Sequence, residues 1–157
     1  MSSTVYLLCG LPGSGKTTYA KELEKQGVLR LSLDEELFRQ YGRNFDSRDS
    51  YKEYEKKTEA DLEVLLISKI KIGESVALDY GFSKKDKRDY YKKIVEQSGG
   101  TLKLLYFKAD PQELLDRLSV RNITDPVNNH VIDQEMMAMF RSQFEEPRGE
   151  DEKIVEK

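Results

Sequence analysis

A glycine-rich stretch at residues 10–17, with the sequence GLPGSGKT, has the residue types and spacing of a phosphate-binding loop. It matches the pattern Gly-x-x-x-x-Gly-Lys-Ser/Thr at every fixed position, and it lies between an apolar run and a helix-compatible segment. Its glycines let the backbone approach an anion, which the N–H groups at the start of a helix then bind. Lys16 is expected to reach the β- and γ-phosphates of a nucleotide, and the Thr17 hydroxyl to hold Mg²⁺. The residues expected to surround the nucleotide are Gly10, Leu11, Pro12, Gly13, Ser14, Gly15, Lys16, Thr17 and Thr18.

Three aspartates follow strand-like runs and are candidate partners of this loop. Asp79 follows an apolar run and has the setting of an acid that helps to hold Mg²⁺, with a solvated turn or an Asx-turn as the alternative. Asp34 can accept or orient the proton of an attacking hydroxyl, and a helix N-cap is a second role compatible with the first. Asp110 precedes a proline and is best explained as a helix cap alone.

Two arginines, Arg117 and Arg121, lie four residues apart on one face of a predicted helix. In the residues that follow, 122–133, apolar side chains do not recur at a regular spacing, which predicts a loop or flap. Arginine is suited to stabilise charge on a transferred phosphoryl group, so both are candidate catalytic and nucleotide-binding residues. The alternative is a solvated basic face paired with Asp116 or Glu113.

Other polar positions carry weaker signals. Arg88 either reaches a substrate anion or lies on the surface. His130 has no Cys or His at ligand spacing, so a metal site built on it is not expected. The sequence SKKD at residues 83–86 faintly matches a guanine-binding tetrapeptide, but a helix cap at Ser83 explains it better. Adenine is therefore favoured over guanine.

Strand-like and helix-like segments alternate along the chain, which predicts a parallel sheet with helices on both faces. In such sheets, ligands bind at the carboxyl ends of the strands. In the segment at 28–33, leucines alternate with Arg30 and Ser32, which predicts an edge strand with one buried face and one solvent-exposed face. The apolar stripe of the helix expected at 50–71 carries Tyr51 and Tyr54 near its beginning, which predicts that this end of the helix lines a cleft. The strands are expected at 5–9, 28–33, 75–78, 102–107 and 153–156, and the helices at 18–25, 35–41, 50–71, 83–98, from 110, and at 133–144.

Length and composition indicate one globular domain over residues 1–157, with a lid at about 117–134. The net charge of −3 does not favour a general nucleic-acid binder. Cys9 is the only cysteine, which excludes an internal disulfide and suggests a small buried residue. No apolar run has the length of a membrane span, and the first residues lack the design of a signal peptide. We expect a cytoplasmic protein without membrane partners, as a monomer or weak dimer.

Several motifs together resemble the small P-loop kinases, a group that includes polynucleotide 5′-hydroxyl kinases, zeta toxins and chloramphenicol phosphotransferases. The likeness is greatest to bacterial AAA-family ATP-binding proteins described as predicted kinases. The motifs are GLPGSGKTT at 10–18, Asp34, LDYGF at 78–82 followed by Arg88, RLSVRN at 117–122 and FEEPRGEDE at 144–152.

This resemblance implies a three-layer α/β fold of the P-loop NTPase type, with a parallel sheet of four or five strands in the order 2-3-1-4-5 and a lid. It also implies a kinase that uses ATP and Mg²⁺, with Asp34 as the base and with Arg117 and Arg121 in the lid. The acceptor favoured is a small-molecule hydroxyl. A polynucleotide or nucleotide 5′-hydroxyl kinase and a nucleotide-dependent regulator are the alternatives.

One position departs from the pattern of the polynucleotide-type kinases, which commonly carry Asp-x-x-Arg after the second strand. Here Leu37 lies three residues after Asp34, and the next basic residue is Arg39. This difference disfavours a nucleic-acid acceptor.

Overall fold

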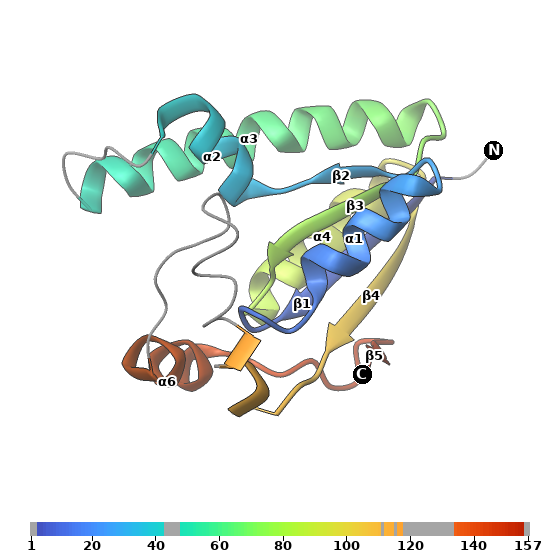
Figure 1. Ribbon diagram of the computed structural model, residues 1–157. Coiled ribbons are helices and arrows are strands. Elements are labelled where there is room, and N and C mark those ends of the chain that lie inside the picture. Colours follow the sequence, from blue (N-terminus) through green and yellow to red (C-terminus); the bar gives the residue numbers. More distant parts are fainter. Residues whose placement is uncertain (1–2, 43–47, 111, 115, 118–133, 156–157) are drawn as a thin grey trace.

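Five parallel strands form one sheet in the computed structural model, which describes residues 3–42, 48–110, 112–114, 116–117 and 134–155 (Figure 1). The sheet order is β2-β3-β1-β4-β5, and every neighbouring pair is parallel. The order predicted from the resemblance is therefore confirmed, and β2 is an edge strand as expected. The strands are β1 (Thr4–Gly10), β2 (Leu29–Leu31), β3 (Val76–Gly81), β4 (Thr101–Phe107) and β5 (Lys153–Val155).

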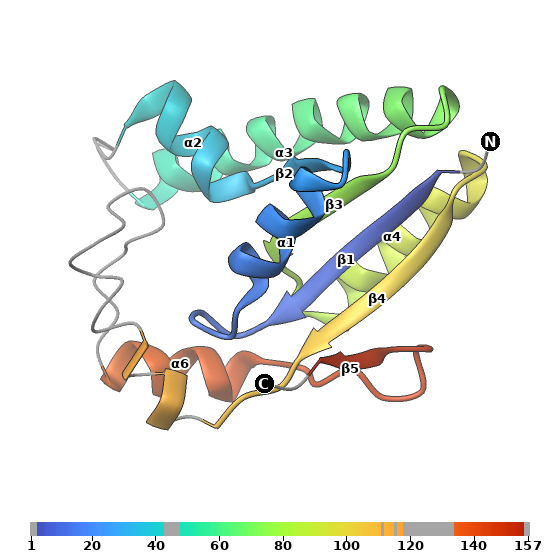
Figure 2. The same cartoon turned by 45° about the vertical axis from the view of Figure 1, so that its right-hand side comes forward.

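Helices cover both faces of this sheet (Figures 1 and 2). Helix α1 lies on one face, whereas α3 and α4 lie on the other, and α6 crosses below the carboxyl end of β1. The helices are α1 (Lys16–Lys25), α2 (Leu33–Tyr41), α3 (Arg48–Lys71), α4 (Lys85–Gln97) and α6 (Gln134–Gln143). The described residues among 112–117 are also helical. Within the described ranges, no helix is both long and apolar enough to cross a membrane.

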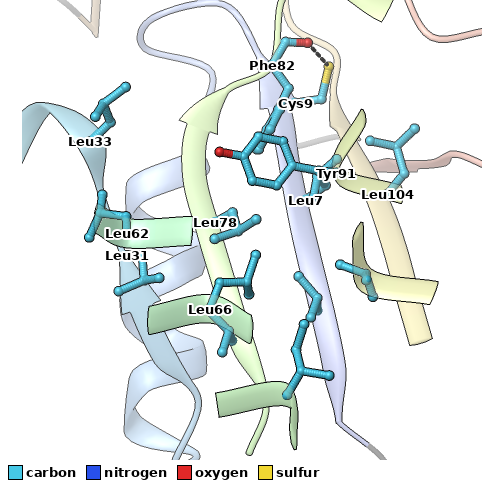
Figure 3. Close-up of a cluster of buried hydrophobic side chains, with 14 of the residues drawn as sticks. Leu7, Cys9, Leu31, Leu33, Leu62, Leu66, Leu78, Phe82, Tyr91 and Leu104 are labelled. Carbon is cyan, nitrogen blue, oxygen red and sulfur yellow. Dashed lines mark hydrogen bonds between the residues drawn. The ribbon is translucent and has the colours of Figure 1, made fainter. Parts of the chain in front are cut away.

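Alternation along β1 produces two hydrophobic cores, one on each face of the sheet. Val5, Leu7 and Cys9 belong to the larger core, which includes residues of α3 and α4 (Figure 3). Leu8 points the other way and packs in a smaller core with Ala20 of α1. Because β1 is buried on both faces, it holds the loop that follows it on a rigid base.

Several element boundaries differ from those predicted. Strand β2 ends at Leu31 and not at residue 33, because Ser32 begins the next helix as its N-cap. The side chain of Arg30 is 8% exposed, so the prediction that one face of this strand is exposed to solvent is wrong. Ser50 lies within α3, which begins at Arg48, and is therefore not its cap. The fifth strand, expected at 153–156, is confirmed over its described residues.

Candidate active site

The phosphate-binding loop leaves the carboxyl end of β1 and enters α1 at Lys16. Gly13 and Gly15 have φ angles of 81° and 99°, a left-handed conformation that favours glycine. Gly10 is required for another reason: a Cβ there would lie 2.6 Å from Ser14 Oγ and 2.9 Å from the Phe107 carbonyl oxygen. Helix α1 begins two residues earlier than predicted, so Lys16 and Thr17 belong to its first turn.

The loop has features that fit a bound triphosphate. Ser14 Oγ is buried and has no hydrogen-bond partner among the described residues. A buried hydroxyl of this kind calls for a ligand atom or water. Lys16 Nζ donates to the carbonyl oxygens of Gly10 and Leu11, at 2.7 and 2.9 Å, so its ammonium lies over the loop where phosphates would bind. The role of residues 10–18 in binding a nucleotide stays a prediction.

A buried polar network lies beside the loop and joins four elements, α1, β2, α2 and β3. Thr17 Oγ1 donates to Asp79 Oδ2 at 2.9 Å, which brings together the two residues predicted to hold Mg²⁺. The Arg30 guanidinium donates to the same carboxylate oxygen, at 3.0 Å from Nη2 and 3.3 Å from Nε. Arg30 Nη2 also forms an ion pair with Glu35 of α2. Asp79 lies inside β3, so the alternative of a solvated turn is wrong.

Asp34 lies in the first turn of α2, one residue after the helix begins. Ser32 is the N-cap, since its Oγ accepts a hydrogen bond from the Glu35 N–H at 3.3 Å. The alternative role of Asp34 as the cap is therefore wrong. Its exposed side chain lines the same cleft as Lys16 and Thr17.

Two clefts meet at the phosphate-binding loop. The first, which we call the nucleoside cleft, has a volume of about 570 Å³. The aromatic rings of Tyr19 and Phe107 meet edge to face there, with centroids 5.3 Å apart. Its lining is Ser14, Gly15, Thr18, Tyr19, Glu22, Phe107, Lys108, Ala109, Asp110, Glu113, Arg117 and Val155.

The second cleft, which we call the acceptor cleft, opens on the other side of the loop and has a volume of about 320 Å³. Tyr51 reaches it from the start of α3, as the tyrosines of that helix predicted. Helix α6 closes another side with Phe140 and the residues after it. Its lining is Gly10, Leu11, Pro12, Lys16, Thr17, Ser32, Asp34, Tyr51, Asp79, Tyr80, Gly81, Ser83, Phe140, Gln143 and Phe144.

Arg117 lies at the edge of the nucleoside cleft. Its Nη1 donates to the Gly13 carbonyl oxygen at 3.2 Å, and its Nη2 lies 3.6 Å from Glu113 Oε2. The ion pair with Glu113 is the one expected for a solvated basic face, whereas the bond to Gly13 holds the guanidinium at the phosphate-binding loop. Asp110 caps this helical segment through the Gln112 N–H, as predicted. Arg121, His130 and nearly all of the predicted lid, residues 118–133, lie outside the described residues.

Burial and negative charge act together on the tyrosines of the acceptor cleft. Burial raises the pKa of Tyr51, and the charges of Glu55 and Asp34 raise it further. Burial likewise raises the pKa of Tyr80, and the charges of Glu59 and Glu63 on α3 raise it further. Both phenols therefore keep their protons at neutral pH. Burial also raises the pKa of the Cys9 thiol to about 11, which agrees with its predicted role as a core residue.

Arg88 is not a surface residue, so that prediction is wrong, and it is not among the residues that line the acceptor cleft. It is buried, and its Nε and Nη2 donate to the two carboxylate oxygens of Glu150 at 2.9 and 3.1 Å. Its Nη1 donates to the carbonyl oxygen of Phe82 at 2.8 Å. Phe82 has a φ of 45°, so this bond holds a strained backbone just after β3.

The segment that follows α6 provides the cap of α4, which was predicted at Ser83. The N-cap of α4 is Lys84, which makes no side-chain cap bond, and the Lys85 N–H donates to Glu145 Oε1 at 2.8 Å. Glu145 N–H in turn donates to the Ser83 carbonyl oxygen at 2.8 Å. The segment after α6 is thus fastened to the end of β3, beside the acceptor cleft.

We expect Arg88→Met to lower the free energy of unfolding by about 3–5 kcal/mol, because it leaves the buried Glu150 carboxylate without its cation. Urea denaturation measures this change. Arg148→Met is the matched control, since the Arg148 side chain is 84% exposed. Equal unfolding midpoints for the two variants would contradict a structural role for the Arg88–Glu150 pair.

The sequence pattern missed several residues of the site. No function was predicted for Arg30 or Glu35, because an arginine between two leucines has the alternating pattern of an exposed position. No functional role was predicted for four other residues that line the acceptor cleft, which are Tyr80, Phe140, Gln143 and Phe144. Their place in the cleft depends on how α6 packs, which no local pattern encodes.

Comparisons with known proteins bear on the family and the fold of this chain. The family model AAA_33, described as an AAA domain, matches residues 5–147. A kinase candidate from Chloroflexus aurantiacus is similar over 99% of this chain and 89% of its own, with a TM-score of 0.76 and 17% identity.

Two other solved structures have the same fold. A chain of the Pnkp1/Rnl/Hen1 RNA repair complex aligns with a TM-score of 0.75 and 19% identity, over 90% of this chain and 44% of its own. A gluconokinase from Sinorhizobium meliloti 1021 aligns with a TM-score of 0.62 and 17% identity, over 99% of this chain and 82% of its own. No curated protein matches the sequence. The match over residues 5–147, on the fold seen here, means that the chain belongs to the AAA_33 family of AAA domains, with the architecture of the small P-loop kinases.

Proposed function

We propose that this protein is an ATP-dependent kinase that transfers the γ-phosphate to a hydroxyl group of a small molecule. One observation carries the proposal: Asp34 lines the same cleft as Lys16 and Thr17, on the side of the loop away from the nucleoside cleft. A hydroxyl compound in the acceptor cleft would therefore lie between a carboxylate and the transferred phosphate. Phosphoryl transfer needs this positioning more than it needs covalent chemistry.

In the transfer step, the acceptor oxygen forms a bond to the γ-phosphorus while the bond between that phosphorus and the β–γ bridging oxygen breaks. The hydroxyl proton passes to a carboxylate oxygen of Asp34, and ADP leaves with the bridging oxygen. Lys16 and Arg117 would stabilise the charge on the phosphates, and Arg121 is expected to assist them.

Thr17 and Asp79 are the residues that would hold Mg²⁺, since a hydroxyl and a carboxylate oxygen already meet there at 2.9 Å. The ion, when bound, would neutralise charge on the phosphate oxygens. Arg30 keeps the Asp79 carboxylate turned toward Thr17, and through Glu35 it fixes the first turn of α2, which carries Asp34.

The rings of Tyr19 and Phe107 support a nucleoside position in the nucleoside cleft, and adenine remains the expected base.

Lys16→Met should weaken binding of ATP and abolish transfer, because the phosphate-binding loop loses its one ammonium group. Fluorescence titration with a labelled ATP analogue measures the affinity. Lys21→Met, on an exposed position of α1, is the control and should bind as the unmodified protein does. Equal affinities in all three proteins would remove Lys16 from the nucleotide site.

A combined thermal-shift and phosphate-transfer screen tests the function. It uses Mg-ATP with metabolites, nucleosides, and aminoglycoside- and macrolide-type antibiotics. The proposal predicts that at least one hydroxyl compound is phosphorylated. Brisk ATP hydrolysis with no labelled acceptor in the whole panel would contradict it and would favour a nucleotide-dependent regulator.

A polynucleotide or nucleotide 5′-hydroxyl kinase is the second candidate, and the likeness to the RNA repair complex is the observation that favours it. Two features count against it. Leu37, at the position where polynucleotide-type kinases commonly carry arginine, is 3% exposed in the core. Among the described residues that line the acceptor cleft, Lys16 is the only cation. We also expect the protein to act in the cytoplasm, as a monomer or weak dimer.

A further inference from the structure

Strands β1 and β3 lose their regular register where they reach the phosphate-binding loop. Leu7 of β1 pairs with Leu78 of β3. Two residues later Cys9 pairs with Gly81, which is three residues further along β3, so β3 contains one extra residue there. Such a bulge is uncommon between parallel strands, and it changes the direction of the side chains beside it. Asp79 lies within this bulge, so the bulge helps to set the position of its carboxylate.

The backbone that follows the bulge has an unusual conformation. Gly81 and Phe82 have φ angles of 87° and 45°, which are both left-handed. Glycine adopts this conformation freely, whereas a bulky aromatic residue rarely does. A strained residue of this kind persists only where the surrounding contacts hold it, and such residues are common at functional sites. The contacts of Phe82 therefore indicate what keeps the end of β3 in place.

Two donors from different elements hold the carbonyl oxygen of Phe82. Arg88 Nη1 of α4 donates to it at 2.8 Å, and Cys9 Sγ of β1 donates to it at 3.3 Å (Figure 3). Cys9 directly precedes Gly10, the first residue of the phosphate-binding loop. The two donors thus join the end of β3 to the strand that carries the loop, just beyond the bulge that contains Asp79.

The rest of the Arg88 guanidinium is held by Glu150, through the hydrogen bonds from Nε and Nη2. The Arg148 N–H also donates to Glu150 Oε2, at 3.3 Å. The planar guanidinium can bind a carboxylate with two of its N–H groups while another N–H points elsewhere, and a lysine ammonium cannot reproduce this geometry. Arg88 therefore makes two separable contacts, the ion pair with Glu150 and the hydrogen bond to Phe82.

We propose that Arg88 is a positioning residue for the Mg²⁺ site. Through the Phe82 carbonyl it maintains the bulge of β3, and the bulge keeps the Asp79 carboxylate 2.9 Å from Thr17 Oγ1. Arg30 holds the carboxylate group itself, whereas Arg88 holds the backbone that carries it. This inference rests on the metal site of the proposed kinase, and it does not depend on which compound is the acceptor.

Arg88→Lys tests the positioning role. Lysine keeps a cation beside Glu150 but cannot also hold the Phe82 carbonyl. We expect Mn²⁺, which prefers the same oxygen ligands as Mg²⁺, to bind about tenfold more weakly in the presence of ADP. The EPR signal of free Mn²⁺ measures this affinity without turnover. Arg148→Lys is the matched control, because its side chain is 84% exposed, and it should bind Mn²⁺ as the unmodified protein does.

Glu150→Gln tests the other contact of the same guanidinium. It removes the charge that pairs with Arg88, keeps an oxygen for one N–H, and leaves the hydrogen bond to Phe82 in place. We expect the urea midpoint to fall, while the Mn²⁺ affinity stays close to that of the unmodified protein. A loss of Mn²⁺ affinity in Glu150→Gln as large as in Arg88→Lys would mean that metal binding only follows stability, and it would overturn the inference. Equal affinities for Arg88→Lys and the unmodified protein would also overturn it.

Cys9→Ala and Cys9→Ser test the same carbonyl without a change of charge. Alanine removes the second donor, whereas serine keeps one, so only Cys9→Ala should weaken Mn²⁺ binding, and by less than Arg88→Lys because a thiol is a weak donor. If Arg88→Lys does not fold, this pair decides, and equal Mn²⁺ affinities for the two variants would overturn the inference. If the unmodified protein with ADP bound no Mn²⁺, the metal site of the proposed kinase would be wrong, and the inference with it.

Discussion

Asp34→Asn is expected to lower the rate of phosphate transfer by about 10²–10⁴-fold, because the amide cannot take the proton of the acceptor hydroxyl. Nucleotide affinity should stay the same, since Asp34 lines the acceptor cleft and not the nucleoside cleft. The side chain is exposed, and the amide has nearly the same shape, so the fold should be unaffected. Single-turnover transfer from labelled ATP and a parallel nucleotide titration give the two quantities.

Asp61→Asn is the matched control, an exposed aspartate on α3 away from both clefts. It should transfer phosphate at the rate of the unmodified protein. If Asp34→Asn and Asp61→Asn were equally active, Asp34 would have no part in the mechanism. If Asp34→Asn instead lost nucleotide affinity, the separation of the two clefts would be wrong.

Arg30→Met is expected to lower the free energy of unfolding by about 3–5 kcal/mol, because it leaves the carboxylates of Asp79 and Glu35 without their shared cation. The Asp79 side chain is 5% exposed, so water cannot replace the lost guanidinium. Urea denaturation measures the effect. The loss should shrink with saturating Mg²⁺ and ADP, because binding near Thr17 restores positive charge to Asp79.

Arg39→Met distinguishes this network from an ordinary ion pair. Arg39 also pairs with a carboxylate of α2, Glu36, but its side chain is 70% exposed. Its replacement should leave the unfolding midpoint close to that of the unmodified protein. A loss in Arg30→Met that is the same with and without Mg²⁺ and ADP would mean that Arg30 supports the fold alone and not the metal site.

The phosphate-binding loop and the parallel sheet could be predicted because their signals are local, whereas the order of the strands came from the resemblance to the small P-loop kinases. The loop at 10–17 is a contiguous motif, and apolar runs mark the strands on either side of it. Asp79 could be placed for the same reason, since the carboxyl ends of neighbouring parallel strands share one edge of the sheet.

Contacts between distant segments could not be predicted. Arg30 has the alternating pattern of an exposed position, and only the approach of β3 and α2 turns it into a buried cation. The cap of α4 comes from Glu145, 60 residues after Lys85, so the local signal at Ser83 was misleading. Asp34 and Ser32 are both good N-cap residues, and their order in the chain does not decide which of them caps the helix.

The fate of the γ-phosphate tests the central claim most directly. Phosphorus NMR of the protein with Mg-ATP and a deproteinised cell extract shows whether the phosphate appears in a phosphate ester or as inorganic phosphate. The account predicts a new ester signal that grows with ADP and is absent with Asp34→Asn. Inorganic phosphate as the sole product, formed at the same rate with Asp34→Asn, would contradict it.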